Sequence, residues 1–228
     1  MRDHLARVDE TREIAQLAAR AMLAADHIEV NLGIMCSIGP ARLGQTLVAF
    51  RQAHPSVRLI LHDVWAERGY QLLSAGRLDC AIMGRHQAMP HQFESVGLYS
   101  EPMVVAMPSN HDLANKEEVK IKNLDNVAYV DRFQCEFREE IFTMIAENGI
   151  SVNVILRSES EDWIQSIVQS DNGVTILPQY SIVSPNIVVR PLAEPLHRQV
   201  ELVHMRDRPH HPVVVELGAF LADYRWPD

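Results

Sequence analysis

Long apolar runs are missing from this 228-residue sequence. No segment approaches the roughly 18 consecutive apolar residues that a membrane-spanning helix needs, and no basic stretch precedes an apolar one in the manner of a secretory signal. Cysteine is scarce: the three cysteines are an odd number without a paired framework, which fits a reducing compartment. These absences predict a cytoplasmic protein without membrane contact.

Positive charge is also in deficit. Lysine and arginine total 21 against 30 aspartates and glutamates, which leaves a formal net charge of −9. A surface of that sign is repelled by nucleic acid, and no basic helix-turn-helix pattern occurs in the sequence. We therefore expect no specific DNA binding by these residues alone.

The usual signatures of a metal centre or an active site are absent too. Four histidines gather late in the sequence, namely His197, His204, His210 and His211. Their spacing matches no zinc site with supporting cysteine or histidine ligands, and no nucleophile, base and orienting group form a catalytic trio. We expect no metal, no cofactor and no enzymatic activity.

What is present is the composition of an ordinary globular domain, with 47% hydrophobic and 22% charged residues. Residues 31–84 alternate between strand and helix patterns. Pro40 suits a first helical turn, and Pro55 must end that helix. Strands are expected at 27–35, 57–62 and 78–83. Consecutive βαβ units of this kind indicate a parallel sheet with a ligand crevice at the carboxyl ends of its strands.

The rest of the sequence repeats this alternation. A helix is expected over 134–148, because Phe137, Ile141 and Ile145 share one helical face. Residues 97–102 are expected to cross between two lobes. Further strands are expected at 93–98, 103–107, 124–130, 152–156, 174–177 and 200–205, and further helices at 160–168 and 213–224.

Residues 1–26 form a predicted helix with a narrow apolar seam. The seam follows a three–four spacing through Leu5, Val8, Ala15, Ala19 and Met22. Such a seam suits pairing with another helix; a surface helix on its own domain is the alternative.

Several segments resemble the effector-binding domain of LysR-type transcriptional regulators. They are Gly33, the helix start at 37–43, FRQAHPSVRLIL at 50–61, LLSAGRLDCAI at 72–82, MPSNHDLA at 107–114 and DNGVTILPQ at 171–179. The resemblance implies an α/β, two-lobed fold like that of type 2 periplasmic binding proteins, with a ligand cleft between the lobes. It also implies the domain limits: 1–26 as a linker-helix remnant, 27–100 with 200–228 as lobe I, and 101–199 as lobe II.

The resemblance also implies partners. In that family an N-terminal winged helix-turn-helix reads DNA, and a long linker helix pairs two subunits. The DNA-reading head is missing here, so the sequence is a truncated chain or a headless relative, and Met1 within the predicted linker helix favours truncation. We expect a homodimer or homotetramer, with the helix around 43–50 as a candidate surface, and DNA contact only through the missing head.

The crevice and the resemblance together predict a site for a small polar or anionic effector. The candidate contacts are Cys36, Ser37, Ile38, Gly39, Trp65, Arg85, Ser100, Glu101, Pro102, Asp131, Phe133 and Cys135. Ser37 lies at a helix start, where free N–H groups attract anions, or it is a simple N-cap. The Arg85 guanidinium is expected to bind a carboxylate through two hydrogen bonds; a solvated arginine on the surface is the alternative. Trp65 packs on the effector or fills the lobe interface.

Cys135 is the basis of an alternative hypothesis, in which the protein senses oxidants or electrophiles. Its segment, VDRFQCEFREE, resembles the peroxide-sensing branch of the family, and a helix start lowers the pKa of a thiol. Met144 stands where that branch has its second cysteine, so no reversible intrachain disulfide is expected from that pair. Cys135 is therefore an oxidant or electrophile sensor, or an unreactive thiol that lines the cleft, whereas Cys80 is expected in the core. A free-standing solute-binding protein is a further alternative.

Overall fold

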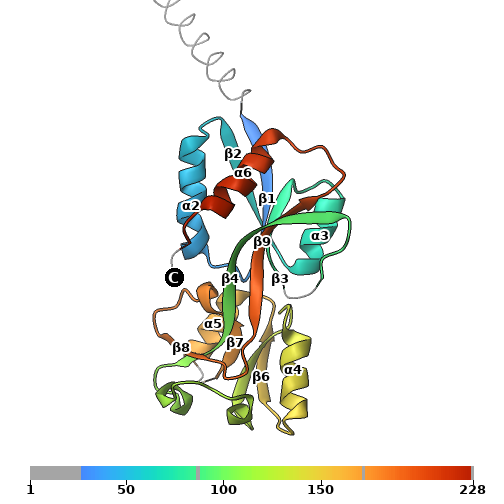
Figure 1. Cartoon of the computed structure of the whole chain (residues 1–228). Coiled ribbons are helices and arrows are strands. Elements are labelled where there is room, and N and C mark those ends of the chain that lie inside the picture. Colours follow the sequence, from blue (N-terminus) through green and yellow to red (C-terminus); the bar gives the residue numbers. More distant parts are fainter. Residues whose placement is uncertain (1–26, 86–87, 171–172, 227–228) are drawn as a thin grey trace, which may run out of the picture.

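The structure is a computed structural model that describes residues 27–85, 88–170 and 173–226. It consists of two lobes, one above the other in Figure 1, joined by two long strands, β4 (Phe93–Pro108) and β9 (His197–Met205). The expected two-lobed α/β fold is confirmed. The predicted linker helix over residues 1–26, with its apolar seam, lies outside the described residues.

The upper lobe is built on a mixed sheet with the strand order β2-β1-β3-β9-β4. β1 pairs in parallel with β2 and β3, whereas β9 runs antiparallel to β3 and β4. The prediction of a parallel sheet is therefore wrong for β9 and β4, because these two joining strands complete the sheet in antiparallel pairs. The elements of this lobe are β1 (Ile28–Met35), α2 (Pro40–Ala53), β2 (Val57–Val64), α3 (Ala66–Ser74), β3 (Cys80–Arg85) and α6 (Pro212–Asp223).

Helices cover both faces of this sheet (Figure 1). Successive strand residues point to opposite faces, so Ile82 packs in the core formed with α2 and α6, whereas Met83 packs on the side of α3. Phe50 of α2 is fully buried, 5.4 Å from the ring of Phe220 on α6. Burial of such a side chain stabilises the fold by roughly 1.5–3 kcal/mol. The contact between Phe50 and Phe220 packs α6, the last helix, against the upper lobe.

The lower lobe is attached to the second half of β4, which pairs antiparallel with β7 and β8. β5 and β6 form a parallel pair beside them. A second core around Phe137 and Ile176 holds this lobe together. Its elements are η1 (Asp112–Asn115), η2 (Ile121–Leu124), β5 (Ala128–Arg132), α4 (Arg138–Glu147), β6 (Asn153–Ser158), α5 (Glu161–Ser170), β7 (Thr175–Pro178), η3 (Gln179–Ser181) and β8 (Ile187–Pro191).

β4 differs from the two short strands that the sequence predicted. It is one continuous strand of 16 residues, because β9 pairs with its first half and β7 and β8 pair with its second half. The register of the β4–β9 pairing shifts between Gly97 and Tyr99. β8 was not predicted. No helix within the described residues is long and apolar enough to cross a membrane.

The start of α4 also differs. The helix begins at Arg138 rather than at Gln134, because the preceding residues form tight turns. In these turns the Cys135 N–H donates to the Arg132 carbonyl, and the Arg138 N–H donates to the Cys135 carbonyl. Residues 133–137 are thus a connecting turn between β5 and α4, and this turn lies at the junction of the two lobes.

Candidate functional site

Arg198 is fully buried where the two lobes meet. It is the second residue of β9, at the point where this strand passes between the lobes. Gly84 on β3 makes room for it, since a Cβ at that position would lie 2.6 Å from both Cδ and Nη1 of Arg198. The missing side chain at position 84 therefore lets a long, charged side chain lie against the sheet.

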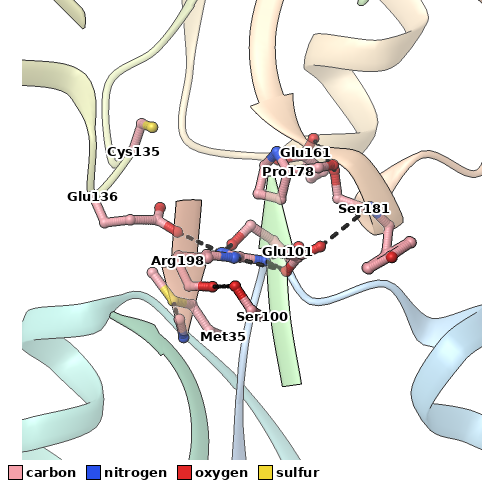
Figure 2. A network of polar contacts seen from close by, with 12 residues as sticks. Met35, Ser100, Glu101, Cys135, Glu136, Glu161, Pro178, Ser181 and Arg198 are labelled. Carbon is pink, nitrogen blue, oxygen red and sulfur yellow. Dashed lines mark hydrogen bonds and ion pairs between the residues drawn. The ribbon is translucent and has the colours of Figure 1, made fainter. Parts of the chain in front are cut away.

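The Arg198 guanidinium is surrounded by oxygen acceptors from both lobes. Its Nε donates to Glu101 Oε1 at 2.7 Å, and its Nη1 donates to Glu136 Oε1 (Figure 2). On the upper side, Nη1 donates to the Ser37 hydroxyl at 2.6 Å and Nη2 donates to the Ser37 carbonyl at 2.9 Å. One side chain thus ties the end of β1 to the turn before α4.

A second buried guanidinium, that of Arg132, is joined to the first through Glu136. Arg132 is the last residue of β5, and its side chain is 1% exposed. Its Nη2 donates to Glu136 Oε2 at 3.3 Å and to the Cys135 sulfur at 3.2 Å. Its Nε lies 3.3 Å from Glu161 Oε2, but neither Nε nor Nη1 makes a hydrogen bond.

The charges at this junction keep one another ionised. Burial alone would raise the pKa of Glu136, but Arg198 and Arg132 outweigh it and hold that pKa below its ordinary value. Burial would likewise lower the pKa of each arginine, but the neighbouring acidic groups raise it. Opposite charges in contact favour the ionised forms, so Glu136 and both arginines are charged at neutral pH.

A pocket of about 500 Å³ opens at this junction, and residues of both lobes line it. A volume of this size suits a small molecule. Its apolar lining includes Ile34, Ile38, Leu43, Leu47, Leu61 and Val183, and its polar lining includes Cys36, Asp63, Ser160, Glu161, Asp162, Gln165 and Ser181.

The structure places Ser37 and Gly39 at the contact between the lobes. Ser37 is fully buried, and its hydroxyl binds Arg198 rather than capping the helix, because the N-cap of α2 is Gly39. A Cβ on Gly39 would lie 1.8 Å from the Tyr180 carbonyl oxygen. The start of α2 therefore presses against η3 of the lower lobe.

Five further predicted residues gather around the same junction. Cys36 and Ile38 line the pocket. Glu101 is 1% exposed and binds Arg198, and the Ser100 hydroxyl donates to the Arg198 carbonyl at 3.4 Å. Pro102 pairs with His197 across β4 and β9.

Trp65 and Arg85 do not line this pocket. The Nε and Nη2 atoms of Arg85 donate to Glu201 Oε2 and Oε1, at 2.8 and 2.6 Å, on the neighbouring strand β9. Trp65 precedes α3 and is 37% exposed. Arg85 thus has a partner within the upper lobe.

The three predicted residues of the lower lobe lie on or after β5. Asp131 is buried and accepts hydrogen bonds from Arg138, the shortest at 2.8 Å, and lies 3.1 Å from Arg157. Phe133 is 44% exposed. Burial raises the pKa of the Cys135 thiol to about 11, although Arg132 opposes it. The expected lowering by a helix start is wrong, because α4 begins three residues later.

Arg132, Glu136 and Arg198 are not among the residues predicted from the sequence. No motif surrounds Arg198, and Gly84, which accommodates it, lies far away in the chain. The one available signal for Arg132 and Glu136 was their position beside Asp131 and Cys135, directly after a predicted strand.

Two α/β lobes that meet at a buried polar junction form a periplasmic-binding-protein-like ligand-binding domain. Residues 23–226 match the LysR substrate binding domain family, and the chain belongs to that family. The chain is similar to the hydrogen peroxide-inducible genes activator of Dickeya chrysanthemi, with 26% identity over 180 residues, which are 78% of this chain and 57% of that protein. The chain spans between half and three fifths of the length of such curated relatives.

Solved structures share the fold. The reduced OxyR regulatory domain from Pseudomonas aeruginosa has a TM-score of 0.71 at 20% identity, over 86% of this chain and 98% of that chain. The Synechocystis PCC6803 CcmR regulatory domain in complex with 2-PG has a TM-score of 0.76 at 18% identity, over 85% of this chain and 95% of that chain. The resemblance stated from the sequence is thereby confirmed.

Proposed function

We propose that the chain is the effector-sensing, dimerising domain of a LysR-type transcription regulator, and that a small polar or anionic effector binds between its lobes. The observation that carries this proposal is the junction itself. Side chains of both lobes converge on two buried guanidiniums, beside a pocket of about 500 Å³ that both lobes line. Guanidinium N–H groups favour carboxylate and other anionic acceptors.

The candidate contacts follow the arrangement of the two lobes. β4 changes its partners after Pro102, which supports lobe limits of 27–100 with 200–228 and of 101–199. Residues 100–102 form the floor of the site. The proposed upper contacts are Cys36, Ser37, Ile38 and Gly39, and the proposed lower contacts are Asp131, Phe133 and Cys135. Trp65 and Arg85, which were also predicted from the sequence, do not line the pocket.

An effector held in this way changes the balance between lobe arrangements. One molecule that touches both lobes favours one angle between them, and its different affinity for the two arrangements shifts their populations. The 2-PG complex of the similar CcmR domain supports a small-molecule effector.

A second copy of the chain is the proposed partner of the α2–β2 face. Val48 is 51% exposed and Leu61 is 54% exposed, next to a hollow of about 540 Å³. Closed two-fold pairing is the commonest form of oligomer, so we propose a homodimer or homotetramer. DNA contact would come from segments outside these 228 residues.

Light scattering tests the pairing. We expect at least a dimer at micromolar concentration, and we expect Val48→Glu to shift it toward monomer because a charge would be buried at the interface. Gln92→Glu adds the same charge at an exposed position on the side of α3 and should leave the mass unchanged. A monomeric wild type at high micromolar concentration would contradict dimerisation.

A thermal-shift screen of small polar and anionic metabolites tests effector binding, since a ligand of the folded state raises the melting temperature. For a compound found in this way, Ser37→Ala should weaken binding by about 0.5–1.5 kcal/mol in calorimetry, the value of one hydrogen bond. Ser109→Ala, in an exposed turn of the lower lobe, is the matched control. Equal affinity in wild type and Ser37→Ala would remove the cleft assignment.

Oxidant sensing through Cys135 is the second candidate function. It is favoured by the Arg132 Nη2 atom 3.2 Å from the Cys135 sulfur, because a cation stabilises a thiolate. Hydrogen peroxide would transfer one oxygen to the thiol, giving a sulfenic acid and water. Trapping of the sulfenic acid and mass spectrometry should then locate it on Cys135 and not on the buried Cys80; absence of modification at Cys135 would reject this function.

A further inference from the structure

We propose that the Glu136 carboxylate is a built-in substitute for the effector's carboxylate, and that the effector is a monocarboxylic acid with an apolar body that displaces Glu136 from Arg198 and Arg132. This inference rests on the proposed function and specifies the chemistry of its ligand. It comes from three features of the junction: the position of Glu136, the incomplete pairing of Arg132 and the balance of charge.

Glu136 bridges the two buried guanidiniums. One carboxylate oxygen accepts from Arg198 Nη1 and the other accepts from Arg132 Nη2 at 3.3 Å (Figure 2 shows the first of these contacts). The side chain is 5% exposed, yet it belongs to the turn between β5 and α4 and not to either element. A rearrangement of this turn can withdraw the carboxylate without unfolding a strand or a helix.

Arg132 is only partly paired by this internal carboxylate. Its Nη1 and Nε atoms make no hydrogen bond although the side chain is 1% exposed. A buried guanidinium with unused N–H groups is costly, and a free carboxylate can bind such a fork with two parallel hydrogen bonds. An external carboxylate can therefore satisfy Arg132 better than the tethered one does.

The charge balance selects a single carboxylate. The two guanidiniums already face three carboxylates, those of Glu101, Glu136 and Glu161. Exchange of Glu136 for one ligand carboxylate leaves this balance unchanged, whereas a dianion would add a further buried negative charge. Asp63 and Asp162 line the adjoining pocket and oppose a second anionic group there.

The pocket determines the rest of the ligand. Its apolar wall is made by side chains of β1, α2 and β2, together with Val183 of the lower lobe. A ligand whose carboxylate lies at the arginines would place its body against this wall, where apolar surface is removed from water. A small acid with an apolar ring or chain fits both parts of the site.

Chemical rescue tests the substitution directly. Glu136→Ala removes the carboxylate and leaves its space between the arginines, so its melting temperature should lie below that of the wild type. Sodium acetate should raise it saturably, beyond the effect of sodium chloride at the same ionic strength. The wild type and Glu139→Ala, which lacks an exposed carboxylate in the first turn of α4, should show no effect beyond chloride. An equal response of all three proteins, or no response of Glu136→Ala, would overturn the proposal.

Benzoate and terephthalate test the ligand class. Benzoate should bind Glu136→Ala about tenfold more tightly than the wild type, because occupation of the site by Glu136 reduces the apparent affinity of a competitor. Terephthalate, with its second carboxylate, should bind Glu136→Ala more weakly than benzoate does. Equal affinity of benzoate for both proteins, or tighter binding of terephthalate, would contradict the inference. Should Glu136→Ala not fold, Glu136→Gln keeps the shape of the side chain, and the same calorimetric comparison applies.

The failure of this inference is distinguishable from failure of the proposed function. A wild-type effector whose binding depends on Ser37, combined with no acetate rescue in Glu136→Ala, would keep the effector domain and reject the role of Glu136. Acetate rescue at position 136 supports that role independently of any metabolite screen.

Discussion

The Cζ atom of Arg42 lies 3.6 Å from the ring centroid of Tyr180. Arg42 is in the first turn of α2 in the upper lobe, and Tyr180 is in η3 of the lower lobe. The rings of Tyr99 and Trp226 lie 4.6 and 6.0 Å from the same carbon atom. A cation–π contact therefore joins the lobes in addition to the ion pairs around Arg198.

Loss of this contact should loosen the closed arrangement. A cation–π pair contributes about 0.5–2 kcal/mol, so Tyr180→Ala should lower the free energy of unfolding by that amount and increase the radius of gyration measured by X-ray scattering. Tyr180→Phe retains the ring and is the matched control. A radius of gyration in Tyr180→Ala that equals the wild-type value would show that the contact does not hold the lobes together.

Two glycine-to-alanine substitutions should have opposite effects on the free energy of unfolding, because only one of the two glycines lies against Arg198. Gly84→Ala places a Cβ 2.6 Å from two atoms of Arg198 and should destabilise the protein by about 1–3 kcal/mol through overpacking. Gly44→Ala, in α2, has no atom within 4 Å of the added Cβ and should stabilise by about 0.5–1 kcal/mol through helix propensity. Urea unfolding of the two variants measures both values; a neutral Gly84→Ala would refute the packing argument.

Acid should weaken the folded state. The pKa of Glu136 is below its ordinary value near 4.5 when the chain is folded, because Arg198 and Arg132 outweigh burial, and Arg85 lowers that of Glu201 in the same way. A lowered folded-state pKa gives stability that is complete above the unfolded value and is lost as pH falls through the folded value. The free energy of unfolding should therefore fall as the pH drops below about 5 and continue to fall through the lowered folded-state values.

Glu136→Gln provides the comparison for that pH profile. It removes one of the two titrating carboxylates, so its free energy of unfolding should start lower at pH 7 and fall less on acidification. Urea titrations at pH 7, 5, 4 and 3 would check this. Parallel profiles for the variant and the wild type would show that Glu136 does not contribute to acid sensitivity.

Cys135 and Cys80 should differ in reactivity. Burial raises the pKa of Cys80 to about 12 and that of Cys135 to about 11, and Cys80 is fully buried whereas Cys135 is partly exposed. Native alkylation with iodoacetamide should therefore modify Cys135 more than about tenfold faster than Cys80, since one pKa unit is a tenfold change in thiolate. Mass spectrometry of the peptides gives both rates, and equal rates would be inconsistent with this order.

Local patterns in the sequence determined most of the order of helices and strands. The apolar strands flanked by helix signals gave the order of β1, α2, β2, α3 and β3, and Pro40 and Pro55 marked the limits of α2 correctly. Gly76 and Gly149, which follow the last residues of α3 and α4, both adopt a φ of 66°, a conformation that favours glycine. Such features depend on neighbouring residues, so periodicity and backbone sterics are sufficient to find them.

The candidate site was decided by the tertiary structure. Ser37 was predicted as an effector contact from its helix start, but its partner Arg198 lies 161 positions away. Arg198 is charged and carries no periodic signal, and its burial depends on the space above Gly84 and on the register between β4 and β9. Contacts between distant charges follow from strand pairing across the lobes, because no local pattern records which acid will face which base.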